Sequence, residues 1–415
     1  INQRISSLQT DFEQKLLQML QNRFVILDKE EQLMGLSAGQ ITQAKALAEK
    51  KGMVDKWVLQ ITNTTRSPYL ETLQDRAVRK RLWECSAYRG MGLDGDVDTQ
   101  PIILELVRLR AEKASILGYE NYAAYSLDTQ MAKKPENVRK MLKDLADGVV
   151  KNAKLEAEQI KKKMLEEGID DELQAWDWLY YAEKLKAEKA AIQDDAVKPY
   201  FELNKVLHDG VFYTMNLLYG IRFEKRTDIP VYHEEVEVYE VFDAEDDSIG
   251  LFFTDYFARA SKRGGAWMSS FVDQSELLHQ KPVIINVMNI AKASGDQPTL
   301  LSLDEVQTLF HEMGHGLHHL LSEVSEPFVS GIRGVAWDVV EFPSQFLDKF
   351  PYAPEVLNIF AQHFETGEAL DAKAIAKLDK ARNFQSAYAT SRQVQFGLFD
   401  FLLHQKYHSE EETQT

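Results

Sequence analysis

The sequence is poor in cysteine, has fewer basic than acidic residues, and has no long hydrophobic runs. Its single cysteine, Cys85, excludes an internal disulfide framework, favours a reducing compartment and is best explained as a small buried hydrophobe. No stretch is long and apolar enough for a membrane-spanning helix, and we expect no signal peptide. With 65 acidic and 48 basic residues, the net charge is −17, which argues against nucleic acid or an anionic membrane as a partner. We therefore expect a soluble cytoplasmic protein.

Most of the chain has the apolar spacing of long helices, and its 415 residues would suffice for two or three domains. Helices are expected over 1–27, 38–50, 66–89, 100–117, 135–167, 172–193 and 202–219. Strands are expected over 236–242, 248–257 and 283–287, with a hairpin loop at Asp243 to Asp247. There are no internal repeats and no low-complexity linker. The pattern predicts a mainly α fold with one small β-sheet.

Directly after this sheet, residues 311–315 read His-Glu-Met-Gly-His and fit the H-E-x-x-H pattern. On a helix over Leu301 to Leu321, which Ser302 or Asp304 could cap, His311 and His315 lie one turn apart on one face and can bind one cation together. Glu312 lies about 100° around the helix, where it can reach a water bound to that cation. Although three fixed positions also occur by chance, two histidines and a glutamate on a largely buried helix favour a catalytic zinc site. The motif predicts a zinc-dependent hydrolase, and most simply a peptidase.

A catalytic zinc needs a third protein ligand, and four acidic residues downstream are candidates. The metzincin extension fails, because its glycine and histidine positions hold His318 and Leu321. A glutamate from a second helix is the alternative, and the candidates are Glu323, Glu326, Asp338 and Glu341. The first two fall in the turn-rich stretch 322–334, whereas the other two begin a helical pattern over 337–350. We expect Glu341 to be the ligand and Asp338 to orient a histidine.

His318 and His319 also lie on this helix. His318 follows His311 by seven positions and so has nearly the same helical face. It could be a fourth ligand, which would close the site and make the zinc structural, but we expect a histidine packed beneath the ligands. His319 points elsewhere and is expected to be a surface residue or a hydrogen-bonded core residue.

Several blocks together resemble the thimet oligopeptidase family of zinc metallopeptidases. They are the motif itself and residues 182–185, 197–201, 253–259, 262–268, 330–338 and 340–345. In that family the glutamate before a hydrophobic residue and Pro-Ser-Gln is the third zinc ligand, and Glu341 matches it. The resemblance implies a zincin-like fold with long helices around a deep channel. It also implies a monomer that takes short unfolded peptides. Family members carry further helical sequence at the N-terminus and a tyrosine-bearing C-terminal segment, so we expect this chain to be truncated at both ends.

The resemblance also places an active-site strand near Gly264. Gly265, Ala266 and Trp267 are therefore the expected substrate-binding residues, because small residues permit close approach of a peptide that adds as a strand. An ordinary turn followed by a core tryptophan is the alternative. We expect a helical wall region over 1–100, a second helical region over 101–230 and a catalytic zinc core over 231–415.

The expected function is hydrolysis of short oligopeptides by one zinc ion, with Glu312 as general base. Release of C-terminal dipeptides is an alternative within the same chemistry. Because the family's tyrosines would stabilise the oxyanion, a chain without them could instead bind zinc and peptide with little turnover.

Overall fold

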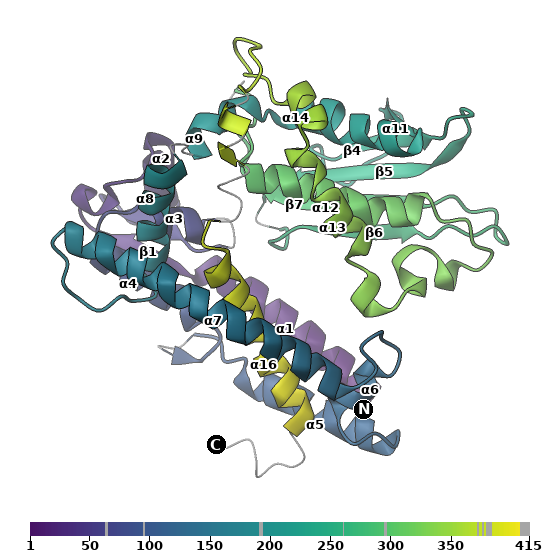
Figure 1. Ribbon diagram of the computed structural model, residues 1–415, viewed down its shortest axis with the longest axis horizontal. Coiled ribbons are helices and arrows are strands. Elements are labelled where there is room, and N and C mark those ends of the chain that lie inside the picture. Colours follow the sequence, from purple (N-terminus) through teal and green to yellow (C-terminus); the bar gives the residue numbers. More distant parts are fainter. Residues whose placement is uncertain are drawn as a thin grey trace. The chain divides into compact units, whose positions relative to one another are not determined.

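The computed structural model describes residues 1–62, 65–93, 96–190, 194–259, 261–293, 297–371, 373–375, 377–378 and 384–406. Figure 1 shows the chain as a ribbon coloured along the sequence. The chain divides into two compact units, Ile1–Lys189 with Asn383–Thr415, and Ala190–Arg382. The first unit is thus made from the two ends of the chain, and the second is a continuous stretch. The three functional regions and the deep channel expected from the sequence stay predictions.

The first unit is almost entirely helical. Its elements are α1 (Asn2–Asn22), β1 (Phe24–Leu27), α2 (Ala38–Lys50), β2 (Trp57–Gln60), α3 (Arg66–Thr72), α4 (Arg76–Ala87), α5 (Gln100–Ile116), α6 (Tyr122–Leu127), α7 (Pro135–Glu166), α8 (Trp178–Ala190) and α16 (Ser386–Lys406). The two strands form an antiparallel ribbon that packs with α2 and α4 around buried apolar residues. The C-terminal helix α16 packs along α7, and the side chain of Glu156 on α7 accepts hydrogen bonds from the first amides of α16.

The second unit combines a five-stranded sheet with short helices. Its elements are α9 (Asp194–Val197), α10 (Leu203–Lys205), a π-helical turn (Val206–Phe212), α11 (Tyr213–Tyr219), β3 (Arg222–Arg226), β4 (Glu237–Phe242), β5 (Ser248–Phe257), β6 (Trp267–Val272), β7 (Val283–Ile290), α12 (Leu303–Leu320), α13 (Phe342–Leu347) and α14 (Pro354–Phe360). The strand order is β3-β4-β5-β7-β6, with β5 and β7 parallel and the other neighbours antiparallel. Strand β6 is therefore an edge strand.

Helix α12 lies along the sheet in Figure 1 and packs against β6 and β7. Its buried apolar side chains, Val306, Leu309, Phe310, Met313, Leu317 and Leu320, join Phe252 of β5 and Ile284 of β7 in one hydrophobic core. Burial of a side chain of this size stabilises the fold by roughly 1.5–3 kcal/mol. The core thus fixes one long face of α12 against the sheet, while α13 also packs against this helix.

The structure confirms the mainly α fold and corrects four helix boundaries. The helix expected over 1–27 ends at Asn22, and residues Phe24–Leu27 are a strand. The helix expected over 66–89 is interrupted after Thr72, because Asp75 caps a new helix by accepting hydrogen bonds from the amides of Ala77 and Val78.

The other two corrections concern the start of α8 and the segment after the motif. The helix expected over 172–193 begins at Trp178, and residues 191–193 lie outside the described part of the chain. Its start follows Asp177, whose buried carboxylate pairs with the buried Arg79 at 3.3 Å. The helical pattern over 337–350 is a 3-10 turn at Trp337–Val339 followed by the short α13. Pro343 explains the break, since proline is tolerated only in the first turn of a helix.

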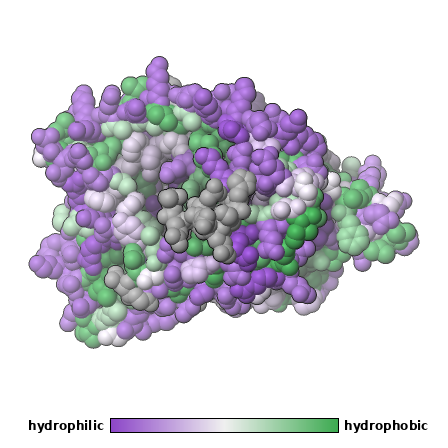
Figure 2. Space-filling view, turned by 90° about the horizontal axis from the view of Figure 1, so that it is seen from below, coloured by the Kyte–Doolittle hydropathy of each residue, from purple (hydrophilic) through white to green (hydrophobic). Residues whose placement is uncertain are grey.

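Most side chains on the face shown in Figure 2 are hydrophilic, and hydrophobic residues gather there in separate patches. Within the described residues, no helix combines the length and apolar composition needed to cross a membrane. Cys85 is a free cysteine that is half-buried beside the core of the first unit, and burial raises the pKa of its thiol.

Candidate metal centre

Helix α12 carries the motif and begins with a complete capping box. The Ser302 hydroxyl accepts a hydrogen bond from the amide of Glu305, and the Glu305 carboxylate accepts one from the amide of Ser302. Asp304 and Glu305 place negative charge in the first turn, where the helix dipole favours it. Of the two expected caps, Ser302 is therefore the one observed. The capped helix fixes the relative position of His311 and His315.

The two motif histidines and Glu341 converge on one point. The Nε2 atoms of His311 and His315 each lie 3.2 Å from Oε2 of Glu341. Their potential ligand atoms all lie within 4.8 Å of one another, and no other such group of histidine, cysteine and acidic side chains is found in the described part of the chain. The structure thus brings together the three residues expected to bind the metal.

Gly314 permits the segment that carries Glu341 to approach the helix so closely. A Cβ atom at Gly314 would lie 2.5 Å from Cα of Ser344 and 2.6 Å from the carbonyl oxygen of Pro343, which is far inside van der Waals contact. Glu341 itself immediately precedes α13, and Oε2 of its carboxylate accepts a hydrogen bond from the Ser344 hydroxyl at 2.8 Å. Glycine between the histidines is therefore a packing requirement, even though it weakens the helix by about 1 kcal/mol.

The donor set fits a tetrahedral zinc ion. Zinc bonds of about 2.0–2.1 Å to nitrogen or oxygen place two ligands of a tetrahedron about 3.3 Å apart, close to the 3.2 Å observed between each histidine and Glu341. Two imidazoles and one carboxylate would leave a fourth position for water or substrate. An open site of this kind can support catalysis.

A carboxylate that the sequence reasoning missed orients the first histidine. Nδ1 of His311 lies 3.2 Å from Oδ1 of Asp348, so the protonated Nδ1 can donate to this carboxylate while Nε2 faces Glu341. This hydrogen bond raises the pKa of His311, and burial of the imidazole opposes the shift only in part. Asp338, the residue that the sequence predicts for such a role, lies in the 3-10 turn before Glu341 with an exposed side chain, and its role stays a prediction. The available signal was the seven-residue spacing between Glu341 and Asp348, which is helical.

Glu312 is buried next to the three clustered side chains. It is 5% exposed, and its Oε2 atom has no hydrogen-bond partner among the described residues. Burial raises the pKa of the Glu312 carboxyl to about 7; His311 opposes this shift, whereas Glu341 and Asp348 add to it. The backbone amide of Met268, in the edge strand β6, also favours the charged form. A buried carboxyl with a pKa near neutrality, close to a free sheet edge, is suited to proton transfer.

The remaining histidines of α12 lie outside the cluster. His318 is half-buried, its pKa is lowered by burial, and it lowers the pKa of His315 electrostatically, so it is near that residue. His319 is a core residue, 1% exposed, whose Nε2 accepts a hydrogen bond from the amide of Ile332. Burial lowers the pKa of His319 to about 4. His319 thus connects α12 to the segment that leads to Glu341.

The three expected substrate-binding residues lie at the start of the edge strand. Trp267 is the first residue of β6, and Gly265 and Ala266 precede it. Gly265 has φ +100°, a conformation that favours glycine, and a Cβ there would meet nothing within 4 Å. The Arg263 guanidinium lies 4.7 Å from the centre of the Trp267 ring.

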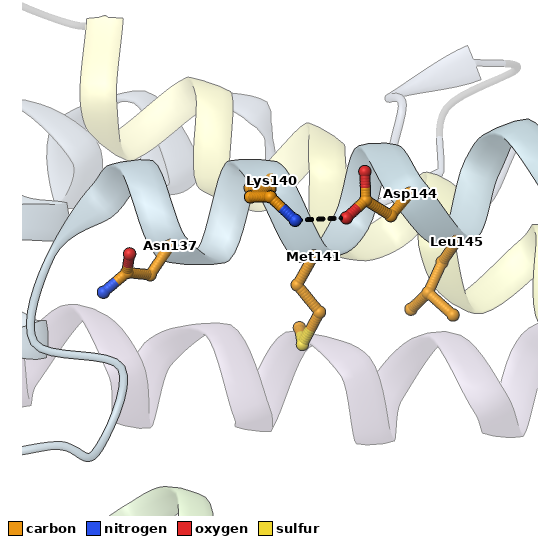
Figure 3. A pocket seen from close by; sticks show the side chains of 5 residues that line it. All are labelled: Asn137, Lys140, Met141, Asp144 and Leu145. Carbon is orange, nitrogen blue, oxygen red and sulfur yellow. Dashed lines mark hydrogen bonds and ion pairs between the residues drawn. The ribbon is translucent and has the colours of Figure 1, made fainter.

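A surface pocket of about 440 Å³ lies elsewhere, on α7 of the first unit (Figure 3). All five lining residues come from this one helix: Asn137, Lys140, Met141, Asp144 and Leu145. Lys140 and Asp144 pair with each other at 2.8 Å, and both are largely exposed. An exposed ion pair one helical turn apart is an ordinary surface feature, so we assign no site to this pocket.

A mainly helical chain with a small sheet beside an H-E-x-x-H helix has the architecture of a zincin-like metallopeptidase. A sequence model described as peptidase family M3 matches residues 69–415, and the chain belongs to this family. The family expected from the sequence blocks is thereby confirmed.

Several curated relatives carry the names of peptidases. The chain is 38% identical over 404 residues to the dipeptidyl carboxypeptidase of Escherichia coli, covering 97% of this chain and 59% of the relative. It is 36% identical over 414 residues to oligopeptidase A of Salmonella typhimurium, covering 98% and 61%. It is 32% identical over 325 residues to saccharolysin of Saccharomyces cerevisiae, covering 74% and 45%. The chain therefore spans about three fifths of the length of the first two.

Proposed function

We propose that the protein hydrolyses peptide bonds in short oligopeptides with one zinc ion, held by His311, His315 and Glu341. The observation that carries this proposal is the convergence of three ligand atoms on one point, with the buried Glu312 beside them. Bound zinc would polarise the scissile carbonyl and lower the pKa of a water molecule toward ~7.

The chain's own residues would supply binding, orientation and proton transfer. Glu312 would accept the proton of the attacking water and later donate it to the departing amine. Asp348 would keep His311 in the tautomer whose Nε2 lone pair faces the metal. Ser344 would hold the Glu341 carboxylate in place through its 2.8 Å hydrogen bond. Each of these residues belongs to the second unit, so the proposed chemistry is placed within one compact part of the chain.

The peptide substrate would bind as an additional strand along β6. This strand is at the edge of the sheet, packs against α12, and places the Met268 amide close to Glu312. Main-chain hydrogen bonds to an edge strand provide affinity with little reading of sequence. Gly265, Ala266 and Trp267 would form the start of this surface. Folded proteins cannot offer an extended strand easily, which agrees with short unfolded peptides as substrates.

Removal of C-terminal dipeptides is a second candidate, because one close relative is named a dipeptidyl carboxypeptidase. The two activities differ in whether a free C-terminal carboxylate is required. Peptides of identical sequence with a free or an amidated C-terminus distinguish them, with products identified by mass spectrometry. Equal cleavage of both forms supports an oligopeptidase, whereas cleavage of the free acid alone supports removal of C-terminal dipeptides.

Glu312→Gln in the zinc-loaded protein tests the central role of Glu312. Glutamine has nearly the same shape but cannot accept the proton, so we expect about a 1000-fold or larger loss in kcat with zinc content unchanged. The assay is cleavage of an internally quenched fluorescent peptide, with zinc measured by mass spectrometry on the same samples. Glu326→Gln, which changes an exposed glutamate outside the cluster, is the matched control and should retain activity.

Three results would contradict the proposal. Retention of about a tenth of the rate in Glu312→Gln would exclude Glu312 as the base. Zinc bound without any cleavage by the unaltered protein would favour a zinc- and peptide-binding role. Zinc binding that also requires His318 would favour a closed structural site.

A cytoplasmic location and a monomeric state complete the proposal, and a single free cysteine agrees with that location.

A further inference from the structure

The connection between β5 and β6 crosses the end of β7. Strand β5 runs parallel to β7, and Phe257 near its end is paired with Ile290; β6 then begins with Trp267 paired with Val287. The chain between these points must therefore pass over the last residues of β7. Asn289 is the residue before the end of β7, which places its side chain beneath this crossing.

Asn289 makes two short hydrogen bonds to the crossing segment. Its side-chain amide Nδ2 donates to the carbonyl oxygen of Arg263 at 2.8 Å and to that of Gly265 at 2.7 Å. Both amide protons of this side chain are used, and both acceptors lie just before the edge strand. The contact fixes the backbone immediately before Ala266 and Trp267.

The earlier part of the crossing is held by a separate buried cluster. The Asp255 carboxylate, 2% exposed, pairs with Arg259 at 2.6 Å and with the Lys262 ammonium at 3.0 Å, and Lys262 also donates to the carbonyl oxygen of Phe257. These charged groups hold the pKa of Asp255 well below its usual range, with burial opposing them. This cluster ends at Lys262, and within the described part of the chain Asn289 is the residue whose side chain donates hydrogen bonds to the backbone of Arg263 and Gly265.

Gly265 needs such support, because glycine can adopt many backbone conformations and no neighbouring atoms restrict this one. It has φ +100° and no atom within 4 Å of a Cβ position, so packing does not restrain it. The guanidinium of Arg263 lies over the Trp267 ring, so fixing the Arg263 backbone also helps to fix that ring. Without the two hydrogen bonds, the start of β6 would sample several conformations.

We propose that Asn289 is a positioning residue for peptide binding, which holds the start of the edge strand in the conformation that accepts an added strand. The inference rests on the proposed function, since it assumes that a peptide binds along β6. Asn289 does not touch the metal cluster, so its effect is on substrate affinity. A strand that is already ordered loses less conformational entropy when the peptide binds, and Asn289 raises the affinity by reducing this entropy cost.

Two substitutions test this role. Asn289→Ala removes both donors, and Asn289→Asp keeps the shape while placing carboxylate oxygens against two carbonyl oxygens. We expect KM to rise roughly 10-fold in the alanine variant, as for the loss of two neutral hydrogen bonds, and further in the aspartate variant. The value of kcat should stay within about 2-fold, because Glu312 and the metal cluster are unchanged. A residue needed only for folding would lower the amount of active protein and leave KM unchanged.

Asn216→Ala is the matched control. Asn216 lies in helix α11 of the same unit, and its side-chain amide also donates to a backbone carbonyl, that of Ile221 just after this helix, at 3.3 Å. Its loss should affect thermal stability without raising KM. A second measurement uses each variant in the Glu312→Gln background, where binding of a fluorescent peptide is followed by anisotropy. The dissociation constant should rise by the same factor as KM.

The outcomes separate this inference from the proposed function. If the unaltered protein cleaves peptides but both Asn289 variants keep KM and the dissociation constant within about 2-fold, the inference is wrong. If the unaltered protein cleaves nothing, the proposed function fails, and the anisotropy measurement still decides whether Asn289 governs peptide binding. If both variants lose their folded circular dichroism signal, Asn289 is a folding residue and the inference is again overturned.

Discussion

The metal cluster joins two regions of the second unit that are built in different ways. Helix α12 is a regular, capped helix, and its spacing alone places His311 next to His315. The segment from Ser322 to Asp348 consists of short turns and one six-residue helix, and it supplies Glu341 and Asp348. Its position depends on contacts with α12, at Gly314 and at His319. One half of the site is therefore encoded locally, and the other half depends on packing.

This difference explains why the two halves respond differently to substitution. A change on α12 that keeps its helical spacing leaves the histidines in place. A change at the contact between α12 and the irregular segment moves Glu341 and leaves the helix intact. Substitutions at this contact and at the residues that it positions should differ in their effect on zinc affinity, and Gly314 should be the most sensitive position.

Gly314→Ala should have the largest effect, because it obstructs the contact without breaking the helix. The added methyl group would lie 2.5 Å from Cα of Ser344, and backbone cannot move aside as a side chain can. We expect overpacking to lower the free energy of unfolding by roughly 1–3 kcal/mol and zinc affinity to fall by about 100-fold or more. Urea unfolding and a competitive zinc chelator measure the two quantities.

Gly148→Ala is the control for this substitution. Gly148 lies within α7, and a Cβ there would meet nothing within 4 Å. Alanine should therefore stabilise the protein by roughly 0.5–1 kcal/mol through helix propensity alone. If Gly314→Ala behaved like this control, Gly314 would have no packing role, and the account of how Glu341 is positioned would be incorrect.

Asp348→Asn should have the next largest effect, through His311. Asparagine can no longer act as a charged acceptor for the Nδ1 proton, so the imidazole is held less firmly and is a weaker ligand. Loss of such an orienting partner typically costs 10- to 100-fold in metal affinity, and we expect a value of about that size. The same chelator titration measures it.

Asp338→Asn is the comparison for Asp348→Asn, because the sequence pattern had suggested Asp338 for this role. If the structural assignment is right, zinc affinity changes in Asp348→Asn and stays close to that of the unaltered protein in Asp338→Asn. The reverse order would restore the original expectation.

His319 should have the smallest effect on zinc affinity, and its contribution is a pH dependence of stability. Its pKa is lowered to about 4 in the folded chain, below the ordinary value of 6.5. As the pH falls below 6.5, the unfolded chain takes up a proton that folded His319 does not, so the free energy of unfolding decreases by up to about 1.4 kcal/mol per pH unit until about pH 4. Above pH 6.5 this contribution is constant.

The pH effect is measured as a difference between two proteins, since other groups also titrate in this range. Unfolding by urea at several pH values, for the unaltered protein and for His319→Gln, isolates the contribution of this residue. The exposed His279, changed to Asn, is the control and should leave the slope unaltered. Parallel slopes for all three proteins would show that His319 is accessible to protons in the folded state.

The sequence predicts the elements that neighbouring residues determine, but it does not predict those that depend on contacts with distant parts of the chain. Helix α12 with its Ser302 cap, helix α2 over Ala38–Lys50 and the hairpin at Asp243 to Asp247 follow from nearby residues. Strand β1 could not be recognised because its partner, β2, begins thirty residues later. The apolar residues of β1 continue the helical spacing of α1, but pairing with β2 makes them a strand of a two-stranded antiparallel sheet.

The candidate site follows the same rule. His311, Glu312 and His315 follow from helical spacing, and Glu341 from its place in a recognisable block. Asp348 was missed because its approach to His311 depends on how α13 turns after Pro343. Asn289 gave no signal either, since its two acceptors are backbone carbonyls more than twenty residues away. Contacts of a side chain with distant backbone leave no pattern in sequence.

The proposed site depends most directly on whether His311, His315 and Glu341 bind one metal ion together. Anomalous diffraction at the zinc edge, from crystals grown with zinc, measures this. We predict one ion in the second unit, with Nε2 of both histidines at about 2.0–2.1 Å and a Glu341 oxygen at about 2.0–2.2 Å. An ion bound by His318, or a Glu341 carboxylate more than about 4 Å from the metal, would contradict it.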